Sequence, residues 1–401
     1  MSKVDAAPAA GRGLRFDRLE IAGSFGDLGT FLPIVVAMIL INGLSPSAVL
    51  LAFGFFYIFT GLFYGLPVPV QPLKAVAAIA IASPALVTVP VIAASGILFG
   101  AVMFVLWAGR LVDLAARLFT PPVVRGIQFS LGLIFLRKGF ELIVSGSMFI
   151  DGREGPFAAH HANLWLGILV FALVLVLLDN RRFPAALVAL AIGITVGIVG
   201  GGPGNAPLAF GPTALRLVIP KAADFWTAAI LLVLPQIPLT IGNSCVGTAA
   251  TAAGLFPDDP RLKRAQAASF AFTMGLANIP AGLLGAIPMC HGTGGLVAHH
   301  RFGARTGGAP IFIGLVLVVM ALAFGQFGFA LLASIPNAVL GVLLVFAGLE
   351  LCPLVRSLKT NEEYFVALVI AGIALAVPNM AWAFGAGILV DQIIRRARVT
   401  V

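Results

Sequence analysis

Hydrophobic positions in this chain fall into long runs with few polar interruptions, and short polar connections separate the runs. Examples are residues 21–44, 47–66, 88–108, 164–178, 309–324 and 365–378. A helix needs about 20 predominantly apolar residues to cross the hydrocarbon core of a bilayer. We therefore expect an all-α polytopic membrane protein with about 14 transmembrane segments, two of which are too short to span.

The composition supports this interpretation, because 60% of the residues are hydrophobic and only 10% are charged. Soluble domains carry about 25% charged residues, so the composition excludes a soluble protein. The three cysteines, Cys245, Cys290 and Cys352, all stand in apolar context. An odd number of such cysteines argues against a disulfide framework.

The formal net charge of +9 suggests nucleic acid as a partner, but the distribution of the basic residues argues against it. When the N-terminus is placed in the cytoplasm, most Lys and Arg residues fall in connections on the cytoplasmic side. Cytoplasmic loops of membrane proteins carry such an excess of positive charge. We therefore predict a lipid bilayer as the environment, a bacterial inner membrane as the location and both termini in the cytoplasm.

Two parts of the chain resemble each other in the order and character of their segments. The Gly- and Pro-interrupted span at 23–38 has a counterpart at 234–249, and the stretch at 65–75 has one at 285–303. Short interrupted segments at matching places in two halves are the best sequence indication of a transporter's binding site. The pattern thus predicts a site built from both halves.

The first of these stretches reads "GLPVPVQPLKAVAAIAIA" and carries three prolines, Pro67, Pro69 and Pro72. Proline disfavours helix at the preceding residue and removes a backbone donor. We expect extended chain to about residue 72 and then a short helix that begins near Leu73, at membrane depth. Its N-terminus carries free amides and a positive dipole. Lys74 adds a cation there, which is unfavourable unless an anion is bound.

The second half offers a facing helix start in "HGTGGL", residues 291–296. Glycines allow a ligand to approach backbone amides closely. Two helix N-termini contribute about one positive charge together, and Lys74 contributes another. This total matches a dianion.

The candidate residues follow from these two stretches and from the interrupted spans beside them. Lys74 either contacts the anion or pairs structurally with Asp27. Asp27 is a coupling or supporting residue, and Thr30 stands one turn after it. His291 could contact the anion, take up a proton or hydrogen-bond a carbonyl. The full set of substrate-binding candidates is Gln71, Lys74, Gln236, Asn243, Ser244, His291, Gly292, Thr293, Gly294 and Gly295.

A separate charged patch, Arg137, Lys138 and Glu141, is expected to hold an internal salt bridge at the outer interface, with anion attraction as the alternative. No nucleophile elbow, His-Glu-x-x-His motif, Walker pair or paired carboxylates appear, so we expect no enzyme. Neither a cofactor nor a metal site is predicted, because His299 and His300 have no carboxylate or thiolate at suitable spacing.

The stretches 26–35, 67–75, 234–244 and 288–308 resemble the molybdate-transporter branch of the SulP anion-transporter superfamily, and the last is the most specific. The chain carries no STAS domain, as is typical of that branch. The resemblance implies a seven-plus-seven inverted repeat, a substrate between two half-helices, and a core domain that moves against a gate domain. Nucleobase relatives place carboxylates in the second-half site, and these stretches have none.

This resemblance implies a division of the chain into core and gate parts. The expected parts are a cytoplasmic N-terminal tail (1–20), first-half core segments (21–110), first-half gate segments (111–200), an external linker (201–224), second-half core segments (225–326), second-half gate segments (327–394) and a cytoplasmic tail (395–401).

We expect a secondary-active transporter for a tetrahedral oxyanion that works by alternating access. Molybdate is the first candidate substrate, and sulfate or tungstate is the second. An anion channel on the same scaffold, a nucleobase transporter and a membrane-embedded enzyme are the alternatives. The sequence leaves open whether the protein forms a homodimer and whether H⁺ or Na⁺ is the coupling ion.

Overall fold

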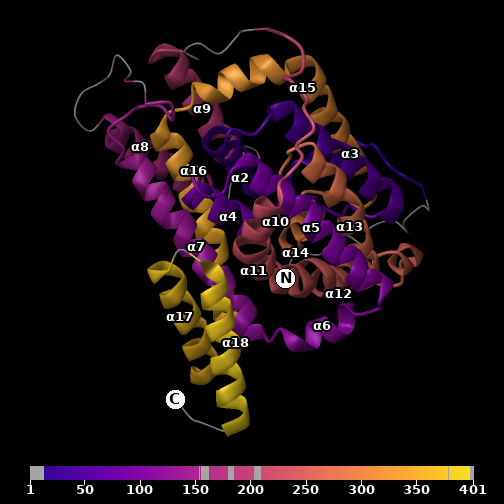
Figure 1. Ribbon diagram of the computed structural model, residues 1–401. Helices are drawn as coiled ribbons and strands as arrows, with labels where there is room; N and C mark the ends of the chain where they lie inside the picture. Colours follow the sequence, from indigo (N-terminus) through magenta and orange to yellow (C-terminus); the bar gives the residue numbers. More distant parts are fainter. Residues whose placement is uncertain are drawn as a thin grey trace.

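The computed structural model describes residues 13–152, 154, 162–178, 185–202, 209–377 and 379–397 of the chain. Parts of the predicted tails (1–20 and 395–401) and of the predicted linker (201–224) therefore lie outside the described residues. The described chain is a bundle of helices with one very short sheet (Figure 1).

The first half of the chain supplies nine of the described helices. They are α1 (Arg18–Ser24), α2 (Leu28–Asn42), α3 (Pro46–Tyr64), α4 (Lys74–Ala82), α5 (Val89–Ala108), α6 (Val112–Leu118), α7 (Pro121–Ile143), α8 (Ala162–Leu177) and α9 (Ala185–Val199). The α-helices of the second half are α10 (Ala222–Ala228), α11 (Leu234–Leu239), α12 (Thr248–Leu255), α13 (Ala267–Leu283), α14 (Thr293–Arg301), α15 (Gly308–Ala333), α16 (Asn337–Leu351), α17 (Asn361–Ala376) and α18 (Met380–Ala397). Two π-helical turns, η1 (Ala229–Val233) and η2 (Thr240–Gly247), and two 3₁₀ turns, η3 (Pro260–Lys263) and η4 (Cys352–Ser357), complete the second half.

Within the described residues, five helices are long and apolar enough to cross a membrane, or six if the bent pair α1 and α2 counts as one span. Three further apolar helices, α8, α9 and α13, have 10–17 residues. The protein is thus a helical membrane protein, as the hydrophobic pattern predicts. The expected count of about 14 segments stays a prediction.

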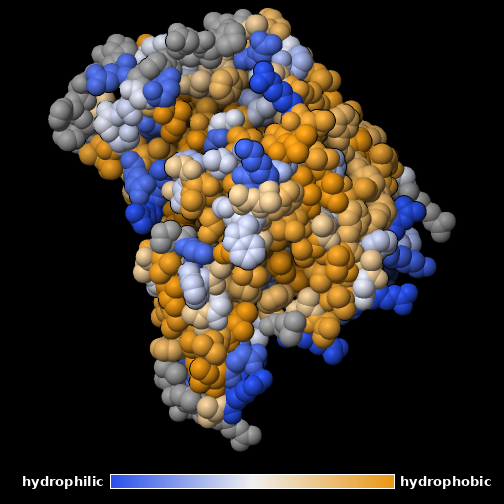
Figure 2. Space-filling model, viewed as in Figure 1, coloured by the Kyte–Doolittle hydropathy of each residue, from blue (hydrophilic) through white to orange (hydrophobic). Residues whose placement is uncertain are grey.

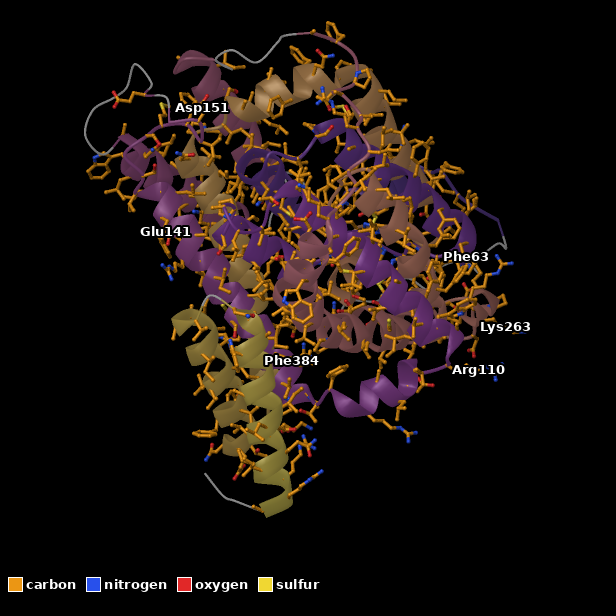
Figure 3. The ribbon with its side chains drawn as sticks, viewed as in Figure 1. Phe63, Arg110, Glu141, Asp151, Lys263 and Phe384 are labelled. Carbon is orange, nitrogen blue, oxygen red and sulfur yellow. The ribbon has the colours of Figure 1, made fainter. Side chains whose placement is uncertain are left out.

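The surface agrees with a lipid environment. Figure 2 shows that hydrophobic side chains cover much of one face, most continuously to the right of its centre, and that hydrophilic side chains stand at several edges and in a smaller central area. Large apolar side chains such as Trp165 and Trp226 are 68% and 71% exposed. Figure 3 shows Arg110 and Lys263 near the end of the molecule that holds α6, and Asp151 near the opposite end. An apolar surface of this extent is stable when lipid covers it.

Apart from α6, the described α-helices pack in two groups, which lie side by side in Figure 1. We name α1–α5 and α10–α15 the core group, in which α3 packs along α15 and α5 along α13. We name α7–α9 and α16–α18 the gate group, in which α7 packs against α16 and α17. Helix α15 is continuous from Gly308 to Ala333, and the expected division of the chain at 326/327 stays a prediction.

Pairs of glycines let the main helices cross closely. A methyl group at Gly54 of α3 would lie 2.9 Å from the carbonyl oxygen of Gly314 in α15. A methyl group at Gly139 of α7 would lie 2.6 Å from the carbonyl oxygen of Gly341 in α16. Small residues at helix interfaces are the usual means of close packing in a membrane, where no hydrophobic effect drives helices together.

The interrupted spans of the two halves differ in structure. In the first half, the chain breaks between α1 and α2 and bends by 41° there. In the second half, the helix is continuous over Ala222–Leu255, but it contains the π-helical turns η1 and η2. π-Helical turns leave part of the backbone ladder irregular and are frequent at functional sites. The sequence predicts both interruptions, although it does not distinguish a break from a π turn.

Two extended stretches meet in the middle of the core group. Strand β1 (Gln71–Pro72) pairs antiparallel with β2 (Met289–Cys290), so that Gln71 lies opposite Cys290. The amide of Leu73 also donates to the carbonyl of Pro288 at 2.9 Å. Helix α4 begins directly after β1, and α14 begins shortly after β2. The predicted extended chain and the short helix that starts near Leu73 are therefore confirmed.

The connection from α12 to α13 anchors the start of the first extended stretch. Arg261 donates from Nη1 to the carbonyl of Gly65 at 2.8 Å and from Nε to Asp259 at 2.9 Å. Hydrogen bonding from Arg261 lowers the pKa of Asp259 below its usual value, so this carboxylate stays ionised beside the guanidinium. Gly65 ends α3 in the left-handed region, at φ 66°. A glycine is needed there because a side chain would strain that backbone.

Candidate functional site

A cavity of about 600 Å³ lies where the core group faces the gate group. Four charged side chains line it, Asp27 and Lys74 from the core group and Arg125 and Glu350 from the gate group. Of the residues expected from the sequence, it also contains Thr30, Gln71, Asn243, Thr293 and Gly294. A small adjoining pocket of about 20 Å³, here called the narrow extension, shares Lys74 and other lining residues with this cavity. It is also lined by Gln236, Ser244 and Cys290.

Lys74 is the first residue of α4 and is half-buried. Within the described residues, no hydrogen bond or ion pair reaches its ammonium group. The expected alternative of a Lys74–Asp27 ion pair is thus not formed in this conformation. A cation at a helix N-terminus is unfavourable by itself, and a lysine inside a membrane protein is costly unless it has a partner. The ammonium is therefore available for a ligand in the cavity.

The N-terminus of α4 is partly satisfied by the protein. Gln236 of α11 accepts a hydrogen bond from the amide of Ala75 at 2.9 Å, and its amide nitrogen donates to Thr240 at 3.0 Å. Both ends of this side chain are therefore occupied. Gln236 thus stabilises the start of the half-helix, in addition to lining the narrow extension of the cavity.

The N-terminus of α14 faces the same cavity with uncharged groups. Gly292 precedes the helix in extended conformation, and Thr293 donates to Asn243 Oδ1 at 2.8 Å. This bond leaves the Asn243 amide nitrogen without a partner among the described residues. Beside it, a side chain added at Gly294 would meet no atom within 4 Å. The space next to Gly294 is thus open to a ligand, and the first amides of α14 have no intrahelical acceptor.

Asp27 contacts residues at both helix starts, Gln71 before α4 and Gly295 in the first turn of α14. The side-chain nitrogen of Gln71 donates to both carboxylate oxygens of Asp27, at 2.7 and 2.8 Å. The carboxylate also packs against Gly295, where an added methyl group would lie 2.6 Å from Oδ2. A methyl group at Gly292 would collide with the side chain of Gln71. Both glycines are therefore required for the close approach of α14 to Asp27 and Gln71.

Comparison with known proteins agrees with this arrangement. The family model described as "Molybdate transporter of MFS superfamily" matches residues 19–135 and 228–351, which include both helix starts. Molybdate transporter 1 of Arabidopsis thaliana is 33% identical, over 94% of this chain and 88% of its own length. Molybdate transporter 2 of the same plant is 30% identical, over 94% of this chain and 87% of its own. The chain belongs to the molybdate transporter family.

Solved structures show which fold this family member has. The transmembrane domain of the cyanobacterial bicarbonate transporter BicA matches with a TM-score of 0.62 and 18% identity, over 95% of this chain and 98% of that domain. SLC26A9 matches with a TM-score of 0.67 and 13% identity, over 95% of this chain and 65% of that one. This molybdate transporter family member therefore has the transmembrane fold of the SLC26 and SulP proteins, as the sequence resemblance implies.

The gate group contributes site residues that the sequence did not indicate. Glu350 of α16 accepts a hydrogen bond from Thr30 of α2 at 2.9 Å. Arg125 of α7 donates to Gln128 at 2.8 Å and to Ser357 at 2.9 Å. Glu350, Arg125 and Gln128 all line the cavity. Glu350 could have been found from the sequence, because it is an ionisable residue within an apolar run. Such a residue in a membrane segment is a functional candidate by default.

His291 lies behind the site rather than in it. Its Nδ1 is 2.9 Å from the carbonyl of Pro69, and its Nε2 is 2.9 Å from Thr273. His299 makes a similar bond to the carbonyl of Pro67 at 3.1 Å. A carbonyl oxygen only accepts, so each Nδ1 carries a proton. Of the three roles considered for His291, the structure shows the carbonyl contact.

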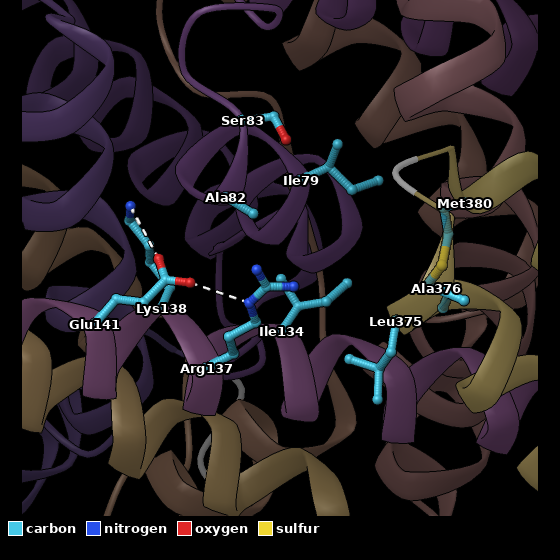
Figure 4. Close-up of a pocket in the computed structure, with 11 residues that line it drawn as sticks. Ile79, Ala82, Ser83, Ile134, Arg137, Lys138, Glu141, Leu375, Ala376 and Met380 are labelled. Atoms are coloured by element: carbon cyan, nitrogen blue, oxygen red, sulfur yellow. Dashed lines mark hydrogen bonds and ion pairs between the residues drawn. The ribbon is translucent and has the colours of Figure 1, made fainter.

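The remaining charged patch forms a second, separate pocket of about 290 Å³ between α4, α7 and α17 (Figure 4). Glu141 stands between Arg137 and Lys138, with N–O distances of 3.0 and 3.5 Å. The predicted internal salt bridge is thus confirmed. Among the described residues, no group of three His, Cys, Asp or Glu side chains could hold a metal ion.

Proposed function

We propose that the protein is a secondary-active transporter of a tetrahedral oxyanion, with molybdate first and sulfate or tungstate second. The observation that carries the proposal is the unpaired Lys74 ammonium in a cavity between two helix N-termini. The cavity is wide enough for such an ion, at about 600 Å³. Neutral donors such as Asn243 and Thr293 suit the remaining oxygens, because hydrogen bonds to an ionised acceptor are strong.

Alternating access of the gate group against the core group is the proposed mechanism. Residues of both groups line the cavity, and a bound ion would touch both. A fourteen-segment, seven-plus-seven inverted repeat underlies the proposal. It is supported by the exchanged packing of α3 with α15 and of α13 with α5, and by the antiparallel pairing of β1 with β2. Transporters built from such repeats bind their substrate at the repeat interface.

A binding comparison on the purified protein tests the proposal. We expect saturable binding of molybdate, tungstate and sulfate, with no binding of uracil. The reason is that Lys74 and two helix N-termini stabilise an anion and offer nothing equivalent to a neutral base. Flux that does not saturate in proteoliposomes would indicate a channel. Binding of uracil alone would contradict the oxyanion proposal.

A further inference from the structure

Glu350 is a carboxylate in a cavity that is proposed to receive a dianion. It extends from α16 of the gate group and is exposed to the cavity rather than packed in protein. Thr30 donates to its Oε2 at 2.9 Å, and no described residue donates to its Oε1. The carboxylate of Glu350 interacts electrostatically with Lys74. The same hydrogen bond joins the gate group to the core group beside the site.

The charges around the cavity balance when it is empty. The carboxylates Asp27 and Glu350 oppose the cations Lys74 and Arg125. Of the other elements packed against α16, α8 and α9 have no titratable side chain in their sequences, and Arg356 of η4 does not line the cavity. An oxyanion that enters with two negative charges would leave an excess of two negative charges beside Asp27 and Glu350. Such an excess is costly unless charge is compensated.

The two carboxylates differ in their capacity to provide that compensation. Both oxygens of Asp27 already accept from Gln71, and the side chain is 3% exposed. Both oxygens of Asp27 are thus occupied by a donor, and little of this side chain is open to the cavity. Glu350 lines the cavity, and its Oε1 has no donor among the described residues, so cavity water can deliver a proton to it. Protonation turns this group from an acceptor into a donor, so it can then bond to an oxygen of the substrate instead of repelling it.

We propose that Glu350 exchanges roles with the oxyanion: ionised, it neutralises Lys74 in the empty site, and it takes up one proton from cavity water when the oxyanion binds. This inference rests on the proposed oxyanion transport. The step is a protonation equilibrium, in which a proton joins the Glu350 carboxylate and returns to water when the oxyanion leaves. Oxyanion and proton thereby move together, and the returning empty site carries the ionised carboxylate.

The test is the pH dependence of molybdate binding between about pH 6.5 and pH 8.5, where molybdate remains a dianion and an isolated Glu is ionised. If binding takes up one proton, the affinity of the wild type for molybdate falls by about tenfold for each unit by which the pH rises. In Glu350→Gln, whose side chain mimics the neutral acid, the dependence disappears and binding at the alkaline end is tighter than in the wild type. Glu141→Gln, a carboxylate change in the second pocket, keeps the wild-type dependence.

Wild-type calorimetry in two buffers of different ionisation enthalpy tests the same point without a variant. We expect uptake of about one proton per bound oxyanion, and a value near zero overturns the inference. An unchanged pH dependence in a folded Glu350→Gln protein also overturns it, as does a dependence that only Asp27→Asn removes. A wild-type protein that binds no oxyanion at any pH contradicts the proposed function instead.

Discussion

The two helix starts in the middle of the molecule, those of α4 and α14, have the same plan and different chemistry. Each helix has 9 residues and follows a two-residue strand. Each stretch begins at a glycine in the left-handed region, Gly65 with φ 66° and Gly285 with φ 63°. The first stretch then contains three prolines and Lys74, whereas the second contains glycines and neutral polar residues.

This difference indicates a division of labour in the site. The start of α4 supplies the charge, and part of its backbone is already bonded to Gln236. The start of α14 supplies open space at Gly294 and amides that have no acceptor among the described residues. The second half also supports the first, because His291 and His299 donate to the carbonyls of Pro69 and Pro67. Those carbonyls have no helical partner, since proline prevents helix there.

The largest expected effect tests the charged start. Lys74→Ala removes the only cation that the core group places in the cavity among its described residues. Loss of one partner of a buried charge contact costs about 3–5 kcal/mol, which corresponds to a loss of affinity of about a hundredfold or more. The measurement is molybdate binding to the purified variant. Lys138→Ala is the matched control, because Lys138 is paired with Glu141 in the second pocket. Unchanged affinity in Lys74→Ala would show that this lysine has a structural role.

A smaller effect is expected at the uncharged start. In Gly294→Val the new side chain enters open space, so we expect the fold to be preserved. The volume that remains for a ligand beside α14 becomes smaller. Overpacking costs about 1–3 kcal/mol, which predicts binding weaker by about tenfold. Gly328→Val is the control, because Gly328 of α15 also has no atom within 4 Å of an added methyl group. A folded Gly294→Val protein that binds molybdate normally would place the ion elsewhere.

The smallest effect on binding is expected at Gln236, which sharpens the comparison. Gln236→Met keeps the length of the side chain but leaves the Ala75 amide without its acceptor. Loss of a bond of this capping type costs about 1 kcal/mol of stability, so a lower melting temperature is expected. Affinity should change by less than about fivefold. A loss as large as that in Lys74→Ala would instead mean that Gln236 contacts the ion.

Local sequence was sufficient to predict the half-helix starts and the lysine at the first of them. Prolines 67, 69 and 72 exclude helix by their own geometry, and β1 and α4 begin where that reasoning places them. Gly26 and Asp27 likewise predict the break between α1 and α2. The glycines on either side of Thr293 predict the start of α14 there, because they leave its backbone amides accessible. These features depend on the residues themselves and their immediate neighbours in the chain.

Other parts of the site depend on contacts between distant residues, and the sequence did not reveal them. Glu350 and Arg125 are far from both stretches in sequence, and they reach the cavity only because α16 and α7 pack against the core group. The partners of Gln236 and His291 likewise come from packing. Hydrophobic runs specify that a segment is buried in membrane or protein, but they do not specify which helices become neighbours.

The sequence by itself determined a membrane protein of the molybdate transporter family, with interrupted segments in two halves and a lysine at one helix start. Apolar length, proline geometry and glycine freedom act locally, so they can be read in order along the chain. The tertiary structure decided which charges meet. It brought Glu350 beside Thr30 and within electrostatic reach of Lys74, and it turned both histidines toward proline carbonyls. The strength of electrostatic interactions depends on distance and on exclusion of water, and packing alone sets both.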